Sequence, residues 1–157
     1  MASGSPFPLL DVLARHEVPF VVIGGHAVCT HGYLRASENV EVVVQKPADV
    51  VERLFAALAE INAKWLGDEI DPQTGLERAI PVSPAYVRST NLMMLITDLG
   101  FLDIFDFIPC FPQVPVDELF ESAIKIDGRP FVSLDWLKKL KLASNRPQDR
   151  IDLENLP

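Results

Sequence analysis

Three polar side chains stand in otherwise apolar segments, where they could act on phosphates or metal ions. Asn39 and Glu41 precede a run of three valines. Residues two apart on a strand leave the same face, about 6.6 Å apart along the strand. Asp103 lies in a Phe-rich segment, where a carboxylate is costly to bury unless it is paired or binds a metal. These residues fit either a metal-binding carboxylate cluster or an exposed strand end on an open sheet face. Asp106 is an odd number of positions from Asp103, so a regular strand cannot direct both into one site.

Two further features favour an anion-binding site. Gly24 and Gly25 follow the apolar run 20–23 and open a short predicted helix. Glycines let a ligand approach the backbone closely, and free N–H groups at a helix start attract anions. An ordinary strand-to-helix turn would have the same sequence. Lys141 falls in the apolar stripe of another predicted helix, where its ammonium must reach water, a carboxylate or a bound anion.

The elements that position these residues alternate between helix and strand. The apolar periodicity and the capping residues predict helices over 9–16, 26–32, 49–61, 116–123, 134–144 and 147–156. Strands are predicted over 20–23, 40–44, 92–97 and 101–108, with short strands flanking the Asp127-Gly128 turn. Residues 65–90 show no clear pattern. This order predicts an α/β (α+β) fold in which helices pack against a mixed β-sheet.

The composition indicates one domain over residues 1–157, with residues 1–5 flexible. Forty-eight per cent of the residues are hydrophobic, which is enough to bury a core. A net charge of −8 argues against general nucleic-acid binding, which needs clustered cations. The two cysteines cannot form a disulfide framework, and the sequence has neither a secretory signal nor a membrane-spanning apolar run. We therefore expect a cytoplasmic protein without membrane contact.

Residues 20–41 closely resemble the start of minimal nucleotidyltransferase-fold proteins of the DNA polymerase beta-like superfamily, which includes relatives of bacterial abortive-infection toxins. That pattern is an apolar strand, Gly-Gly-x-Ala-x-x-x-His-Gly, and then Arg-x-Thr/Ser-x-Asp-x-Asp. The run 132–141 and the residues after it are similar to the family's Ser-Leu-Glu-x-Leu-x-x-x-Lys, Gly-Arg-x-x-Asp and Asp-Leu. The matching residues after that run are Asn145-Arg146-Pro147-Gln148-Asp149 and Asp152-Leu153.

The resemblance implies a nucleoside triphosphate held at the Gly-Gly turn. It also implies three acids that hold two magnesium ions and assist transfer of a nucleoside monophosphate to a hydroxyl, with release of pyrophosphate. Carried over to this chain, the catalytic positions are Asn39, Glu41 and Asp103, of which Glu41 and Asp103 would be metal ligands. The nucleotide-binding positions are Gly24, Gly25, His26, Arg35, Ser37 and Lys141. His26 stands at the helix start and could touch a phosphate, whereas His31 is interpreted as packing or capping.

The chain departs from the family at the metal site, because Asn39-Val40-Glu41 replaces Asp-x-Asp. Asn39 offers a neutral carbonyl oxygen, whereas magnesium prefers anionic oxygens in octahedral geometry. Glu41 keeps its charge, but its extra methylene shifts the carboxylate by about 1.5 Å. Misplacement by about 1 Å can cost on the order of 100-fold in rate. We therefore expect weakened magnesium binding and severely impaired chemistry.

Two hypotheses follow from these residues. The first is a nucleotide-binding or regulatory protein with weak or no catalysis, within a toxin–antitoxin pair. The alternative is an active magnesium-dependent nucleotidyltransferase. A small domain of this kind has little wall on its acceptor side, so a partner protein or a homodimer is also expected.

Overall fold

The computed structural model describes residues 5–157, so residues 1–4 of the segment expected to be flexible lie outside the described part. The helices are α1 (Phe7–Arg15), α2 (Gly24–Thr30), α3 (Ala48–Glu60), α4 (Pro84–Ser89), α5 (Val116–Ser122), α6 (Leu134–Ser144) and α7 (Pro147–Asn155). The strands are β1 (Phe20–Ile23), β2 (Asn39–Val44), β3 (Lys64–Ile70), β4 (Glu77–Pro81), β5 (Leu92–Thr97), β6 (Gly100–Phe105), β7 (Ile124–Ile126) and β8 (Arg129–Phe131).

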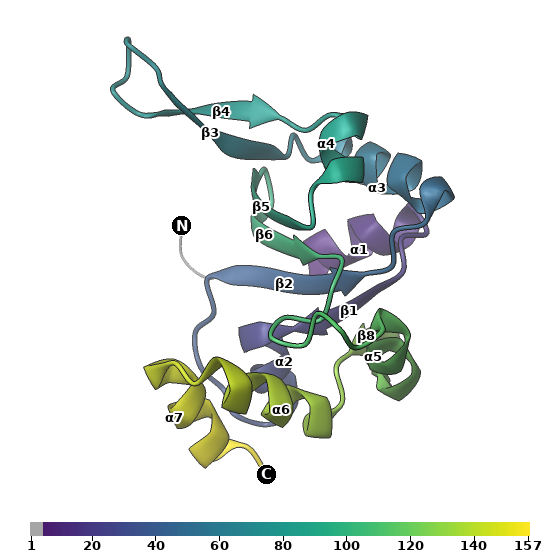
Figure 1. Cartoon of the computed structure of the whole chain (residues 1–157). Helices are drawn as coiled ribbons and strands as arrows, with labels where there is room; N and C mark the ends of the chain where they lie inside the picture. The colour runs from purple at the N-terminus through teal and green to yellow at the C-terminus, as the bar shows by residue number, and fades with distance from the viewer. Residues whose placement is uncertain (1–4) are drawn as a thin grey trace.

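The strands form one eight-stranded sheet in the order β4-β3-β5-β6-β2-β1-β8-β7 (Figure 1). The pairs β1–β8 and β2–β6 are parallel, and the other neighbouring strands are antiparallel. The expected α/β fold with a mixed sheet is therefore confirmed.

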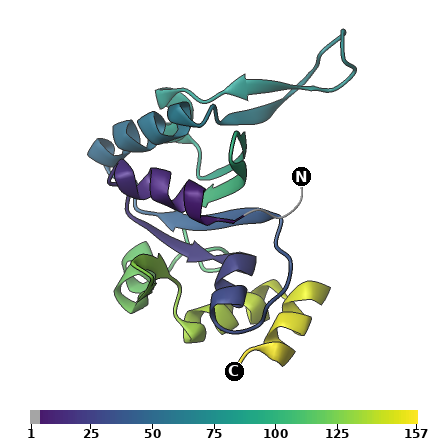
Figure 2. The ribbon, with the colours of Figure 1, turned by 180° about the vertical axis from the view of Figure 1, so that it is seen from behind.

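Apolar strands and amphipathic helices build the core around the middle of this sheet. All four residues of β1 are buried, as an unbroken apolar run predicts. Helices α1 and α3 lie across one face of the sheet (Figure 2) and bury their Leu and Val stripes there. Helix α6 begins where the Ser133 hydroxyl accepts a hydrogen bond from the backbone N–H of Trp136.

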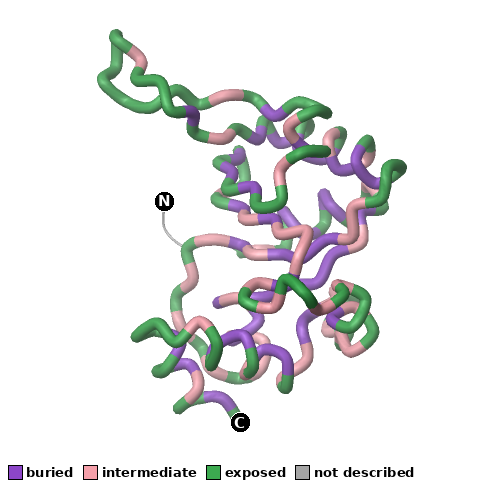
Figure 3. Tube along the Cα trace, viewed as in Figure 1, coloured by how far each residue is buried: buried purple, intermediate pink, exposed green. Residues whose placement is uncertain are grey.

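The other face of the sheet stays open over β5, β6 and the start of β2. Along β5 the residues alternate strictly between exposed and buried, so that Met93 and Leu95 enter the core while Met94 and Ile96 face outward. Figure 3 shows that the projecting hairpin β3–β4 is largely exposed. On β2, Asn39 and Glu41 are half-buried while Val40 and Val42 are buried. The two polar residues of β2 therefore share one face, as their spacing predicts.

Two parts of the chain differ from the sequence-based expectations. The segment 65–90, which gave no pattern, forms the projecting hairpin β3–β4 and the short helix α4. The strand expected to reach residue 108 ends at Phe105, because its hairpin partner β5 begins at Leu92, opposite Phe105. Just beyond this point, Asp106 keeps one backbone hydrogen bond to Asn91 and forms an ion pair with Lys46 at 3.1 Å.

Within residues 5–157, every helix is too short or too polar to cross a lipid bilayer.

Candidate functional site

The strand register places Glu41 and Asp103 side by side in one row across the sheet, next to the end of β1. Glu41 of β2 lies opposite Ile23 of β1 on one side and opposite Asp103 of β6 on the other. Gly24 follows Ile23 directly, so the row continues into the glycine turn. The turn, the altered acidic pair and the third acid therefore meet at one place on the open face.

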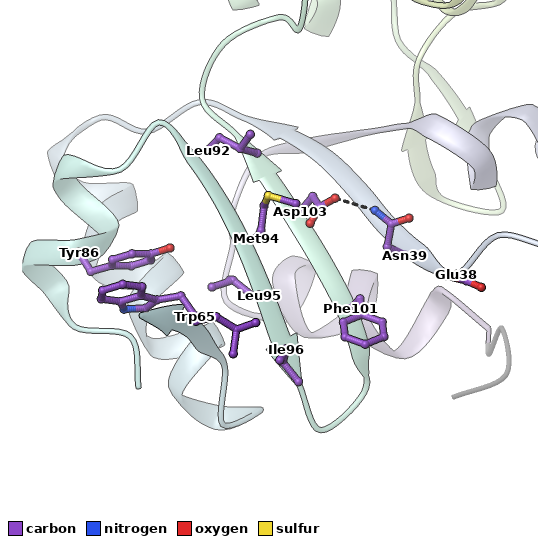
Figure 4. Close-up of a pocket in the computed structure, with 11 residues that line it drawn as sticks. Glu38, Asn39, Trp65, Tyr86, Leu92, Met94, Leu95, Ile96, Phe101 and Asp103 are labelled. Carbon is purple, nitrogen blue, oxygen red and sulfur yellow. Dashed lines mark hydrogen bonds between the residues drawn. The ribbon is translucent and has the colours of Figure 1, made fainter. Parts of the chain in front are cut away.

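Asn39 and Asp103 are joined directly by a side-chain hydrogen bond. The Nδ2 atom of Asn39 donates to Oδ2 of Asp103 at 2.6 Å (Figure 4). Burial raises the pKa of the Asp103 carboxyl, and the hydrogen bond from Asn39 opposes that rise. An N–H group thus faces this carboxylate, where a metal centre would require a second ligand oxygen.

The two glycines of the turn lie against the protein's own side chains. Gly24 has a φ of +72°, and a methyl group on it would overlap the carboxylate of Glu41. A methyl group on Gly25 would overlap the hydroxyl of Ser37, whose Oγ also donates to the Asn39 backbone carbonyl at 3.4 Å. The positive φ of Gly24 and the short, close side chain of Ser37 beside Gly25 therefore both favour glycine here, whether or not a ligand approaches the turn.

The surroundings of Glu41 contain groups that raise its pKa and groups that lower it. Burial raises the pKa of its carboxyl, and the negative charge of Asp103 raises it further. The positive charges of Lys141 and Arg146 act in the opposite direction but do not cancel the rise. The Glu41 carboxyl therefore holds its proton more tightly than a solvent-exposed glutamate does.

An ion-pair network holds the C-terminal helices against the loop that precedes β2. The Lys141 ammonium lies 3.1 Å from Asp149 and 2.9 Å from Asp152, with only 8% of its side chain exposed. Arg35 donates to both carboxylate oxygens of Asp152, at 2.6 and 2.8 Å. A lysine in an apolar stripe must reach water, a carboxylate or a bound anion, and Lys141 meets carboxylates.

The network forms one wall of a cavity of about 540 Å³, here called the polar cavity. It is lined by Gly25, Arg35, Ala36, Ser37, Glu38, Asn39, Glu41, Asp103, Lys141, Arg146, Pro147, Gln148 and Asp149. The lining includes most of the predicted site residues. Gly24 instead lines a smaller neighbouring cavity, which it shares with Glu41, Lys141 and Arg146.

His26 and Arg146 differ from the sequence-based site. His26 does not line the polar cavity; it is half-buried, and burial followed by the charge of Arg35 lowers its pKa. Arg146 was not predicted as a site residue, although it lies in the Gly-Arg-x-x-Asp-like motif. Its guanidinium contacts Asp149 at 3.1 Å and leaves 69% of the side chain exposed beside the polar cavity. The arginine of this motif was therefore the sequence feature that could have identified Arg146 as a site residue.

The donor set fits a two-metal centre poorly. Residues 5–157 contain no group of three or more His, Cys, Asp or Glu side chains arranged to hold a metal ion. Glu41 and Asp103 supply two carboxylates, but Asn39 presents its nitrogen to Asp103. Magnesium needs several oxygen ligands in octahedral geometry, so we derive no reaction step through it.

Comparison with solved structures gives the fold. The lincosamide antibiotic adenylyltransferase LnuA, in its lincomycin-bound crystal structure, matches with a TM-score of 0.60 and 17% identity, over 99% of this chain and 97% of that one. A candidate nucleotidyltransferase from Thermotoga maritima matches with a TM-score of 0.54 and 15% identity, over 94% and 87% of the two chains. An antigenic nucleotidyltransferase-like protein from Paracoccidioides brasiliensis matches with a TM-score of 0.52 and 18% identity, over 94% and 69%.

No protein-family model matches the sequence, and a search of the curated proteins finds no match. The structural likeness nonetheless confirms the expected nucleotidyltransferase fold.

Proposed function

We propose that this chain, which has a nucleotidyltransferase fold, binds a nucleoside triphosphate in the polar cavity but has a degraded two-metal site. It then acts as a nucleotide-binding or regulatory protein with weak or no catalysis. The observation that carries this proposal is the amide nitrogen of Asn39, which donates a hydrogen bond to Asp103 where a catalytic metal would need ligand oxygens.

The charges around the polar cavity support nucleotide binding on one side of it. Three cationic side chains, Arg35, Lys141 and Arg146, line that cavity near the C-terminal helices. Asp152 pairs with both Arg35 and Lys141, and Asp149 pairs with Lys141 and Arg146. Of the three cations, Arg146 has the most exposed side chain, at 69%. The phosphates would therefore meet Arg146 first. The volume of about 540 Å³ lies within the range typical of small-ligand sites.

The acids on the opposite side support the loss of chemistry. Glu41 is packed against Gly24, and its side chain is one methylene longer than the aspartate of the family's motif, which displaces the carboxylate from that position. Asp103 already accepts the Asn39 hydrogen bond. A metal would have to displace that hydrogen bond and rotate the amide before it could bind both side chains.

One observation favours the alternative, an active magnesium-dependent nucleotidyltransferase that transfers a nucleoside monophosphate to a hydroxyl acceptor. Glu41 and Asp103 are register partners on adjacent parallel strands and line the same cavity. Two carboxylates thus remain where this chemistry needs them, and a measurable low rate would be sufficient to identify it.

Calorimetric titration of ATP, GTP, CTP and UTP, with and without magnesium, tests the proposal alongside an assay for pyrophosphate release. We expect binding that depends little on magnesium, with little or no turnover. Magnesium-dependent binding with steady pyrophosphate release would establish the alternative.

A pair of variants locates the binding. Arg146→Gln removes the exposed cation of the polar cavity and should weaken nucleotide affinity by about tenfold, equivalent to about 1.4 kcal/mol. Arg150→Gln makes the same change within α7, the helix that Arg146 precedes; Arg150 contacts Asn145 and does not line the cavity. Equal losses in both variants would show only long-range attraction and would contradict the assigned site.

A further inference from the structure

A second hollow adjoins the polar cavity on the open face of the sheet. This apolar groove has a volume of about 540 Å³ and is lined by Glu38, Asn39, Trp65, Leu66, Tyr86, Leu92, Met94, Leu95, Ile96, Phe101 and Asp103 (Figure 4). It shares Glu38, Asn39 and Asp103 with the polar cavity. The two hollows therefore meet at the Asn39–Asp103 hydrogen bond.

The floor of the apolar groove consists of the outward side chains of two paired strands. Met94 lies opposite Asp103, and Ile96 lies opposite Phe101. Met94 is 64% exposed and Phe101 is 44% exposed. Exposed apolar residues that gather in one hollow mark an interaction site more strongly than the same residues scattered over a surface.

An aromatic pair forms the opposite wall. The rings of Trp65 and Tyr86 stack with their centroids 5.0 Å apart and an interplanar angle of 7° (Figure 4). They come from β3 and α4, the part of the chain that rises beside the open sheet. This wall makes the surface concave, and concavity of this volume suits a small molecule, whereas protein partners usually cover broader surfaces.

The charge of the lining selects the kind of ligand. The described residues that line the apolar groove include two acids, Glu38 and Asp103, and no Lys, Arg or His. Asp103 is half-buried, so its carboxylate is partly shielded from water. A carboxylate has about four acceptor sites, and the described contacts give Asp103 one side-chain donor, Asn39. A hydrogen-bond donor or a cation at this end would be stabilised, and an anion would be repelled.

We infer that the apolar groove binds a small molecule with an apolar body and a positively charged or hydroxyl-bearing head group, which meets Asp103. The apolar body lies on Met94 and Phe101 and against the Trp65–Tyr86 wall. This site is distinct from the proposed nucleotide site, although the two share Asp103. A ligand in each would bring the head group beside the polar cavity.

Three probes that share one ring and differ only in their head group test the charge preference: phenylpropylamine, phenylpropanol and phenylpropanoate. Binding is followed by NMR through the Trp65 indole N–H and the Met94 methyl group. The indole of Trp136, which packs against Phe111, is the internal reference. We expect the amine to bind tightest, at least about tenfold tighter than the carboxylate, with shifts confined to the groove.

Met94→Lys places a cation on the exposed floor and should abolish amine binding while improving carboxylate binding. Leu142→Lys adds the same charge at a 70% exposed position on α6, outside the apolar groove, and should leave the order unchanged. Equal affinities, no binding, shifts spread over the surface, or the same effect from both variants would overturn the inference.

Sedimentation of the unliganded chain measures its oligomeric state and tests whether a second copy occupies the groove. A stable dimer that Met94→Lys dissociates would assign the groove to a second copy and overturn the inference; a monomer would support it. Nucleotide binding is measured separately. Amine binding without ATP binding would contradict only the proposed function, and ATP binding without amine binding would contradict only the inference about the groove.

Discussion

Asn39 donates a 2.6 Å hydrogen bond to Asp103 from the neighbouring parallel strand, so an amide and a carboxylate meet where the two hollows join. The chain contains a second pair of the same kind: Asn62 donates at 2.6 Å to Asp98, far from the polar cavity. This second pair is a natural control for changes in the first.

The double variant Asn39→Asp with Glu41→Asp should raise magnesium affinity. It adds a negative charge beside Asp103 and shortens the side chain that packs on Gly24, and magnesium prefers anionic oxygens. Calorimetric titration with magnesium measures the change. Asn62→Asp adds the same charge beside Asp98 and should leave magnesium affinity near that of the parent chain. Unchanged affinity in the double variant would contradict the interpretation of this strand as the remnant of a metal site.

Gly25→Ala should destabilise the fold by about 1–3 kcal/mol, the usual cost of overpacking. In an unconstrained helix the same change stabilises by up to about 1 kcal/mol, so the clash with Ser37 decides the sign. Chemical denaturation measures the effect. Ser37→Gly in the same chain should recover much of the loss, because it removes the group that the new methyl would meet. If Gly25→Ala were neutral or stabilising alone, the contact with Ser37 would not exist.

Acid should weaken the fold through Asp149. Burial alone would raise the pKa of this carboxyl, but hydrogen bonds led by those from Arg146 outweigh burial and hold the pKa at about 2. The unfolded value is about 3.9. A lowered folded pKa stabilises the protein above the unfolded pKa, and the stabilisation is lost as pH falls from about 4 towards 2. Denaturation curves across this range should show a steep loss.

Asp149→Asn should flatten that loss and lower stability at neutral pH, since Lys141 and Arg146 each lose an anionic partner. Asp68→Asn, on the exposed hairpin β3–β4, is the control and should leave the curve as it is. A parent-like slope in Asp149→Asn would show that another group controls the acid transition.

Glu41→Gln should stabilise the fold at neutral pH, the opposite effect to the Asp149 change. Burial and then Asp103 raise the pKa of Glu41 in the folded chain, so stability falls as pH rises from the unfolded value through the folded one. A glutamine stays neutral at every pH, so the variant does not lose this stability. The difference in unfolding free energy should disappear below about pH 4, near the unfolded pKa of glutamate. A variant less stable than the parent at pH 7 would indicate that the ionised carboxylate is held by favourable contacts.

Much of the fold could be predicted because local patterns and tertiary packing agree there. The apolar run of β1 and the Ser133 cap of α6 each have one dominant physical explanation. The turn at Asp127-Gly128, where both residues have positive φ, likewise matches its local sequence. The spacing of Asn39 and Glu41 likewise predicts their shared face, because side chains alternate along any strand.

The wall of the apolar groove could not be predicted in this way. Trp65 lies in a strand with little burial and pairs with Tyr86 of a six-residue helix, so neither element has a long periodic pattern. Their contact depends on the hairpin joining the sheet through the single register pair Lys64 and Ile96. A contact fixed by so little pairing leaves no signal in the local sequence.

The partners of Lys141 depend equally on tertiary structure. The helical periodicity places this lysine in an apolar stripe but does not identify what it meets. Asp149 and Asp152 come from the next helix, which turns back after the left-handed Asn145. Only that reversal shows that the buried ammonium has carboxylate partners.

A manganese titration of the unmodified chain, followed by NMR, tests most directly whether Asn39 has replaced a metal ligand. Manganese is paramagnetic and shares the oxygen preference of magnesium, so a bound ion broadens nearby signals. We predict that the side-chain amide signals of Asn39 persist, with no selective broadening around Glu41 and Asp103. Selective loss of those signals at low manganese concentration would show a working metal centre and contradict the degraded site.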